Sequence, residues 1–270
     1  MSLNLVVAHR LEADPLVTYF KMNLIEKSPY TIYQGDGGIQ LIVSGIGYDN
    51  AISAVTFLAE RQITSQKNSK GWINIGIAGH QTAGIGSIFT ANKVVYQKTG
   101  EAYYPSLNFS SFASVELITV DQVELNYPND CAYDMEGAGF FKSAVQYSTV
   151  EFIHSIKIIS DNRLRSVEGI TKKLINTLMS QSCVDIEKFL KMIEVQIKEF
   201  GQVINFGEGY LNLFQELHFT NTQRSQLKRY CQRYNALGRG KELESISSVK
   251  WQSSKALLHE LANNLKVKEQ

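Results

Sequence analysis

The sequence of 270 residues predicts an α/β protein with a mixed, mainly parallel sheet flanked by helices and a helical extension at its carboxyl end. The first observation is that short apolar runs alternate with segments of helical periodicity up to about residue 160. The second is that these runs are continuously apolar, which is typical of parallel strands buried on both faces. The third is that only helical periodicity continues from about residue 169 onward.

The expected elements follow one another in a regular order. Apolar runs predict strands over residues 3–8, 30–34, 39–43, 72–77, 93–97, 115–120 and 152–159. Helical spacing predicts helices over residues 15–24, 51–60, 136–147 and 170–200. Residues 35–38, Gly-Asp-Gly-Gly, predict a hairpin between the second and third strands, because glycine readily adopts positive φ.

A change in composition divides the chain near residue 200. Residues 201–270 carry ten lysines and arginines against six acidic residues, whereas the remainder carries 17 against 20. We therefore expect a main domain of residues 1–200 and a helical, mildly basic carboxy-terminal extension of residues 201–270.

The extension contains a well-marked helix over residues 223–237. Residues 220–223 fit a capping box, and Gly238 fits a carboxy-terminal stop. Basic residues share one face of this helix and apolar residues another: Arg224, Lys228 and Arg229, and Leu227, Tyr230, Tyr234 and Leu237. Two interpretations stay open, a solvated helix packed on a core or a docking surface for nucleic acid or an acidic protein, and we favour the first.

Composition narrows the classes of function. Basic and acidic residues nearly balance at 27 and 26, so no global charge directs the chain to nucleic acid or to an anionic membrane. Cys131, Cys183 and Cys231 are odd in number and outside metal-ligand spacing, which favours reduced thiols in a cytoplasmic protein and gives no metal site. The amino-terminal apolar run stops after a few residues, so we expect neither a signal peptide nor a membrane span.

Polar and glycine-rich residues gather at the ends of several expected strands. They are Glu12, residues 44–47, residues 78–80, and Ser160 with Asp161. Because ligands of parallel α/β sheets bind at the carboxyl ends of the strands, we expect these segments to converge on one site. Taken alone, each carboxylate has a simpler interpretation as a helix cap, a turn former or a solvated first-turn residue.

Four ordered motifs resemble the purine nucleoside phosphorylase and nucleosidase superfamily, most closely its methylthioadenosine/S-adenosylhomocysteine nucleosidase branch. Residues 43–47 resemble its Ser-Gly-Ile-Gly segment, residues 74–79 its Asn-x-Gly-Ser-Ala-Gly segment, and residues 134–138 its Glu-Met-Glu-Ala/Gly/Ser segment. Residues 159–161 close the match, which covers roughly residues 3–165. The resemblance implies that the main domain is a catalytic domain that cleaves the N-glycosidic bond of a plain or 5′-modified purine nucleoside.

The resemblance also implies roles for individual residues. Asp161 would protonate N7 of the purine, Glu136 would bind the ribose hydroxyls, and Glu12 would orient or deprotonate the attacking water. These groups suit the reaction, since positive charge develops on the sugar and negative charge on the departing base. The other expected substrate-binding residues are Met135 against the ribose, Ser160 beside the acid, and Asp134, Ala78, Gly79, His80 and Ser44. For His80 the alternative is a histidine hydrogen-bonded within its own loop.

The sequence departs from the superfamily pattern at the phosphate site. Asn74 stands where the phosphorylases have an arginine and Ile77 where they have a serine, and an isoleucine side chain cannot donate to an oxyanion. We therefore expect hydrolysis with no metal or organic cofactor, and phosphate is a co-substrate only in the alternative of a phosphorylase. Ile77 also leaves open a catalytically reduced nucleoside-binding or scaffold protein. The resemblance further implies a homodimer.

Overall fold

The computed structural model describes residues 2–62, 70–107, 112–204 and 217–266. Contacts within the chain define two compact units, Met1–Ile197 and Lys198–Gln270. Among the helices in the described ranges, none is both long enough and apolar enough to cross a membrane.

The strands of the first unit form one mixed sheet in the order β10-β6-β8-β9-β5-β1-β4-β3-β2, with β7 paired to β6. Their bounds are β1 Ser2–Val7, β2 Asn23–Glu26, β3 Thr31–Gln34, β4 Gln40–Val43, β5 Lys70–His80, β6 Ile88–Tyr96, β7 Ala102–Tyr103, β8 Ala113–Thr119, β9 Ala132–Asp134 and β10 Ile153–Asn162. Strand β10 pairs with both β5 and β6, so β5, β10, β6, β8 and β9 close into a ring. Within the sheet, β1, β4, β5 and β10 run parallel, as do β6, β8 and β9.

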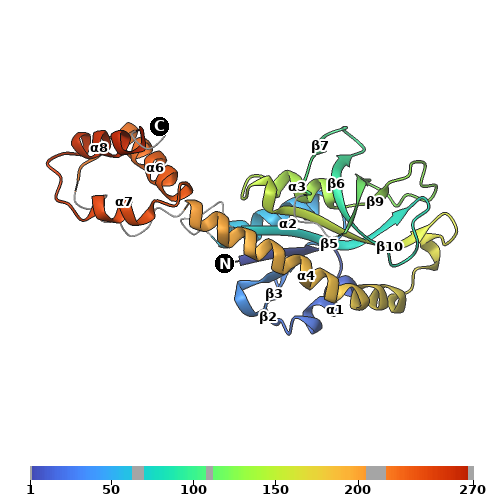
Figure 1. The fold of residues 1–270 in the computed structure, drawn as a ribbon. Coiled ribbons are helices and arrows are strands. Elements are labelled where there is room, and N and C mark those ends of the chain that lie inside the picture. Colours follow the sequence, from blue (N-terminus) through green and yellow to red (C-terminus); the bar gives the residue numbers. More distant parts are fainter. Residues whose placement is uncertain (1, 63–69, 108–111, 205–216, 267–270) are drawn as a thin grey trace. The chain divides into compact units, whose positions relative to one another are not determined.

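Helices cover both faces of this sheet, which confirms the predicted class (Figure 1). Helices α2 (Tyr48–Arg61) and α3 (Gly137–Ala144) lie on one side, and α1 (Arg10–Tyr19) and α4 (Lys172–Ile204) on the other. Successive side chains of a strand point to opposite faces of the sheet, so alternate residues of β1 pack against the helices on the two sides. Val6 joins the core formed with α2 and α3, whereas Leu3 meets Ile193 and Ile197 of α4 beside Gly71.

The first helix differs from its prediction. Helix α1 covers Arg10–Tyr19 rather than residues 15–24. It begins early because Glu12 closes a capping box with His9, whose amide donates to the Glu12 carboxylate over 2.9 Å. Leu24 lies in the edge strand β2, so the apolar spacing that predicted one longer helix runs across a helix, a turn and a strand.

The second unit contains α6 (Asn221–Ala236), α7 (Gly240–Ser247) and α8 (Ser254–Lys266). Their apolar side chains form a core of their own, which includes Leu227, Cys231, Tyr234, Leu243, Leu257 and Leu261. The predicted capping box of Thr220 and Gln223 is confirmed, and Gly238 follows the helix with a φ of 69°. The apolar pattern groups Leu237 with the buried face, but this side chain is 51% exposed because the helix ends one residue before it.

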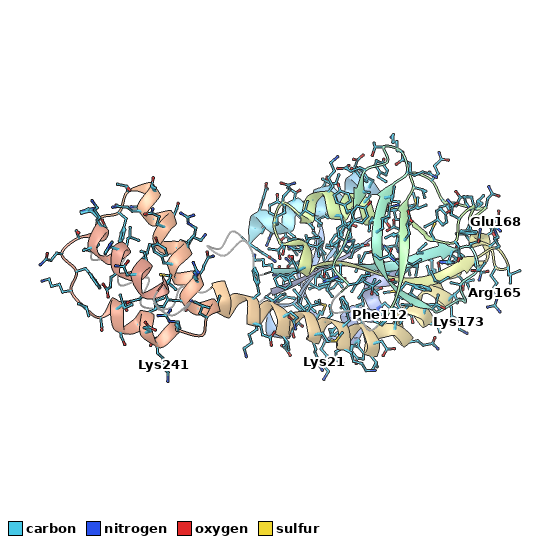
Figure 2. The ribbon with its side chains drawn as sticks, turned by 45° about the horizontal axis from the view of Figure 1, so that its top comes forward. Lys21, Phe112, Arg165, Glu168, Lys173 and Lys241 are labelled. Atoms are coloured by element: carbon cyan, nitrogen blue, oxygen red, sulfur yellow. The ribbon has the colours of Figure 1, made fainter. Side chains whose placement is uncertain are left out.

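The basic side chains of α6 lie at the surface of the second unit. Arg224, Lys228 and Arg229 are exposed, as is Lys241 of α7, which projects outward in Figure 2. Helix α6 therefore packs its apolar face on the unit's own core, as in the favoured interpretation, and contact of its basic face with nucleic acid or an acidic protein stays the untested alternative.

The close approach of α3 to the start of α2 gives a test of the packing in the first unit. A Cβ at Gly139 would lie 2.1 Å from the carbonyl oxygen of Tyr48, so Gly139→Ala is expected to force the helices apart and to destabilise the fold by about 1–3 kcal/mol in urea unfolding. The matched control is Gly169→Ala in the short helix η3 (Val167–Gly169), where a Cβ meets open space. Equal stability of the two variants would contradict this packing.

Candidate active site

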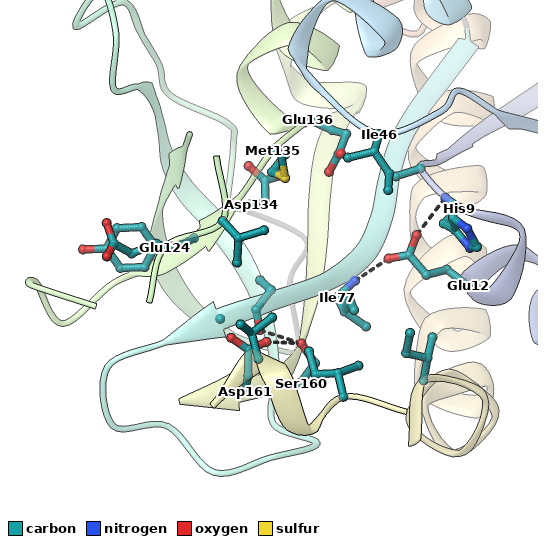
Figure 3. Close-up of a pocket in the computed structure, with 18 of the residues that line it drawn as sticks. His9, Glu12, Ile46, Ile77, Glu124, Asp134, Met135, Glu136, Ser160 and Asp161 are labelled. Carbon is teal, nitrogen blue, oxygen red and sulfur yellow. Dashed lines mark hydrogen bonds between the residues drawn. The ribbon is translucent and has the colours of Figure 1, made fainter. Parts of the chain in front are cut away.

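A cavity of about 280 Å³ lies in the first unit (Figure 3). Its lining comes from segments at or just after the ends of β1, β4, β5, β8, β9 and β10, from the loop before β9 and from the first turns of α1 and α4. These segments are far apart in the sequence. This is the edge of an α/β sheet at which ligands usually bind, and the volume is near the lower end of the range of roughly 300–1,000 Å³ for small-molecule sites.

Glu12 enters the cavity from the first turn of α1 and is 5% exposed. Its two carboxylate oxygens accept from the backbone amides of Ile77, over 2.8 Å, and of His9, over 2.9 Å (Figure 3). A Cβ at Gly76 would lie 2.8 Å from the first of these oxygens, so a glycine is needed there for Glu12 to reach the sheet. Burial raises the pKa of Glu12, although these amides and the ammonium of Lys157 act in the opposite direction.

Glu136 enters the cavity as the residue that precedes α3. Its carboxylate accepts from the amide of Gly47 over 2.8 Å, and Gly47 has a φ of 109° that favours glycine. Burial, together with the neighbouring carboxylate of Asp134, raises the pKa of Glu136 to about 7.

Lys157 lies beneath these carboxylates in the middle of β10 and is 1% exposed. Its ammonium is 2.8 Å from a carboxylate oxygen of Asp134, which also accepts from the amide of Gly137 over 2.8 Å. Burial alone would lower the pKa of Lys157, but the carboxylates of Asp134, Glu136 and Glu12 raise it. The cluster therefore holds one buried cation among three carboxyl groups.

Asp161 and Ser160 line the other end of the cavity. Both reach it because the pairing of β10 with β5 shifts register between Ile159 and Asp161, and such a bulge redirects side chains that would otherwise point to opposite faces. The Ser160 hydroxyl donates to Asp161 Oδ1 over 2.5 Å, and the hydroxyl of Tyr127 donates to Asp161 Oδ2.

The structure brings most of the predicted site residues to this cavity. Its lining includes Glu12, Ala78, Gly79, Asp134, Met135, Glu136, Ser160 and Asp161. The lining does not include Ser44 or His80, both of which are buried. The Ser44 hydroxyl donates to the carbonyl of Gly45, and His80 Nδ1 accepts from the amides of Thr82 and Ala83, so backbone contacts satisfy these side chains.

Sequence reasoning missed three groups of the site. Lys157 had a recognisable signal, since it is the one lysine within the apolar run that predicts the strand over residues 152–159. Tyr127 and Glu124 lie in the loop before β9, where no local pattern distinguishes a cavity residue from a turn residue. Within the described ranges, no group of histidine, cysteine and acidic side chains is arranged to hold a metal ion.

Comparisons with known proteins identify the fold. No protein-family model and no curated protein matches the sequence. A 5′-methylthioadenosine/S-adenosylhomocysteine nucleosidase from Helicobacter pylori is similar in structure, with a TM-score of 0.58 and 12% identity over 71% of this chain and 98% of that chain. For a 5′-methylthioadenosine nucleosidase from Arabidopsis thaliana the TM-score is 0.58 and the identity 17%, over 71% of this chain and 95% of that chain. For futalosine hydrolase from Helicobacter pylori the TM-score is 0.55 and the identity 14%, over 73% of this chain and 98% of that chain.

The chain thus has the fold of these nucleosidases, as the sequence motifs predicted. These three structures are those of two nucleosidases and a hydrolase, and the likeness extends over nearly the whole length of each.

The raised pKa of Glu136 gives a test of the buried cluster. Between the ordinary pKa of a glutamate and about 7, Glu136 holds a proton in the folded state that it has lost in the unfolded state. The free energy of unfolding of the wild type therefore falls as the pH rises through this window. Glu136→Gln keeps an acceptor for Gly47 and removes the charge. We expect the free energy of unfolding of the variant, relative to that of the wild type, to be on the order of 2 kcal/mol higher at pH 8 than at pH 5, measured by urea unfolding.

The control for this measurement is Glu60→Gln, an exposed glutamate of α2. It should leave the pH dependence of stability as it is in the wild type. A Glu136→Gln variant whose stability relative to the wild type is the same at pH 5 and pH 8 would show that Glu136 is not a buried, proton-binding carboxyl group.

Proposed function

We propose that this chain is an enzyme that hydrolyses the N-glycosidic bond of a purine nucleoside. The observation that carries the proposal is the convergence of Glu12, Glu136 and Asp161, distant in sequence, on one cavity of a nucleosidase-like fold. Fold alone does not prove an activity, so the support comes from the chemistry of these three groups.

Departure of the base requires a proton donor, because the electrons of the broken bond move onto the purine. Asp161 is suited to this task, since it is 4% exposed and two hydroxyl donors hold its carboxyl group at the wall of the cavity. In the proposed reaction Asp161 gives its proton to N7 of the purine as the bond from the sugar carbon C1′ to N9 breaks.

The sugar left behind carries positive charge, which nearby anions stabilise. Glu136 faces the cavity beside Met135, and in the proposed complex it accepts hydrogen bonds from the ribose hydroxyls while Met135 packs on the sugar. Three carboxyl groups surround the single ammonium of Lys157. When these groups are ionised the cluster carries a net negative charge, which favours a cationic sugar.

Water completes the reaction by bonding to C1′ and losing a proton. Glu12 is proposed to take that proton, and its raised pKa makes it a stronger base than an exposed glutamate. Its hydrogen bonds to the amides of Ile77 and His9 fix its direction. The proton gained by Glu12 balances the one lost by Asp161, and exchange with solvent restores both groups.

The cavity favours water over phosphate as the nucleophile. Its described lining contains no lysine or arginine but five acidic residues, namely Glu12, Glu124, Asp134, Glu136 and Asp161. Asn74 lies outside the lining, since its amide donates to the carbonyl of Val6 and accepts from Ser155. A phosphate dianion would therefore meet five acidic side chains and neither a lysine nor an arginine.

The proposal predicts that the protein releases base from purine nucleosides in phosphate-free buffer, and that Asp161→Asn slows this release at least about 100-fold. Chromatography of the free base, over a panel with hydroxyl and thioether groups at the 5′ position, measures the rate. The control is Asp185→Asn. This aspartate of α4 is half-buried, pairs with Lys188 and lies outside the cavity lining, so its substitution should leave the rate unchanged. Unchanged release by Asp161→Asn would rule out its role as the acid.

The same assay separates the alternatives. Turnover that requires phosphate and yields a sugar 1-phosphate would identify a phosphorylase. Calorimetric binding of a nucleoside without release of base would identify a binding or scaffold protein. The homodimer that the resemblance implies stays a prediction.

A further inference from the structure

We propose that Tyr127 is a positioning residue for Asp161, whose carboxyl group it holds at the cavity wall. The inference rests on the proposed function, in which Asp161 is the acid. Tyr127 lies in the loop before β9, and neither the sequence motifs nor the proposed reaction assigns it a role.

The contact between the two residues is direct and protected from water. The Tyr127 hydroxyl donates to Asp161 Oδ2, while the Ser160 hydroxyl donates to Asp161 Oδ1 over 2.5 Å. Tyr127 is 1% exposed and Asp161 4%, so water does not compete for this hydrogen bond. Burial and the bond to Asp161 raise the pKa of Tyr127, which keeps its hydroxyl protonated and therefore a donor.

The backbone around Tyr127 is held in an uncommon conformation. Its φ is 44°, in the left-handed region that large side chains rarely adopt. The Tyr127 carbonyl accepts from Arg163 over 2.9 Å and from Gln81 over 3.1 Å, and Arg163 also donates to the carbonyl of Asn126 over 3.1 Å. A backbone strained in this way persists when its surroundings fix it, and such positions cluster at functional sites.

Gly79 of β5 leaves the space in which Tyr127 and Asp161 meet. A Cβ on Gly79 of β5 would lie 2.4 Å from the Tyr127 ring and 2.6 Å from Asp161 Oδ2. Any larger residue would therefore push the two side chains apart. Gly79 thus acts on the site through the space that it leaves for the hydrogen bond.

Removing the Tyr127 hydroxyl takes away the donor to Asp161 Oδ2, while the phenyl ring of a phenylalanine still fills the same place. The direction of the carboxyl group then depends on the Ser160 hydroxyl alone. Because a proton donor acts in the transition state, loss of its direction should lower kcat rather than weaken substrate binding.

The test separates kcat from KM for base release. We expect Tyr127→Phe to lower kcat about tenfold, the effect of one lost hydrogen bond, and to leave KM unchanged. The matched control is Tyr96→Phe, because Tyr96 also donates to an aspartate, Asp121 over 2.6 Å, but lies outside the cavity lining. The control should keep both constants of the wild type, and an unchanged kcat in Tyr127→Phe would overturn the inference.

A second measurement keeps this result separate from the proposed function. Crystal structures of Tyr127→Phe and Gly79→Ala show the direction of the Asp161 carboxyl group. We expect this group to turn away from its wild-type direction in both variants, because each loses the hydrogen bond from Tyr127. An unmoved carboxyl group would overturn the inference even in an active enzyme, whereas a turned one in a protein that releases no base would leave the inference standing and remove the proposed function.

Discussion

The rest of the site depends on the buried ion pair between Lys157 and Asp134. One oxygen of Asp134 meets the Lys157 ammonium and also accepts from the amide of Gly137, so the pair joins the centre of β10 to the first turn of α3. Loss of one partner would leave an uncompensated charge in the interior, which typically costs 3–5 kcal/mol. The same ammonium lowers the electrostatic cost of keeping Glu12 and Glu136 beside each other.

Glycines give the carboxyl groups access to this centre. Gly76 leaves room for Glu12, Gly79 for Asp161, and Gly47 adopts the positive φ that presents its amide to Glu136. Backbone amides then fix the direction of each glutamate before any ligand is present. Such fixed donors and acceptors are a basis of electrostatic catalysis, because they need not reorganise during the reaction.

The sequence predicts much of the fold and part of the site, and the division has a physical cause. Continuous apolar runs identify buried strands, and ordered motifs at strand ends place Glu12, Glu136 and Asp161 together, because the carboxyl ends of parallel strands meet at one edge. The predicted bounds of helix α1 were wrong because its start depends on a histidine cap that apolar spacing does not reveal. Ser44 and His80 are polar residues at strand ends that bond to nearby backbone instead of facing the cavity. Tyr127 reaches Asp161 only through a tertiary contact.

The fold joins a site with three differently held carboxyl groups to a separate helical unit that has its own core. The central claim is that the three carboxyl groups of the site surround one nucleoside. A crystal structure with a purine nucleoside analogue that resists cleavage tests it most directly. The account predicts Asp161 within hydrogen-bond distance of the purine N7 and Glu136 within that distance of the ribose hydroxyls, with Glu12 beside C1′. An analogue bound elsewhere, or bound in this cavity without contact to these groups, would contradict it.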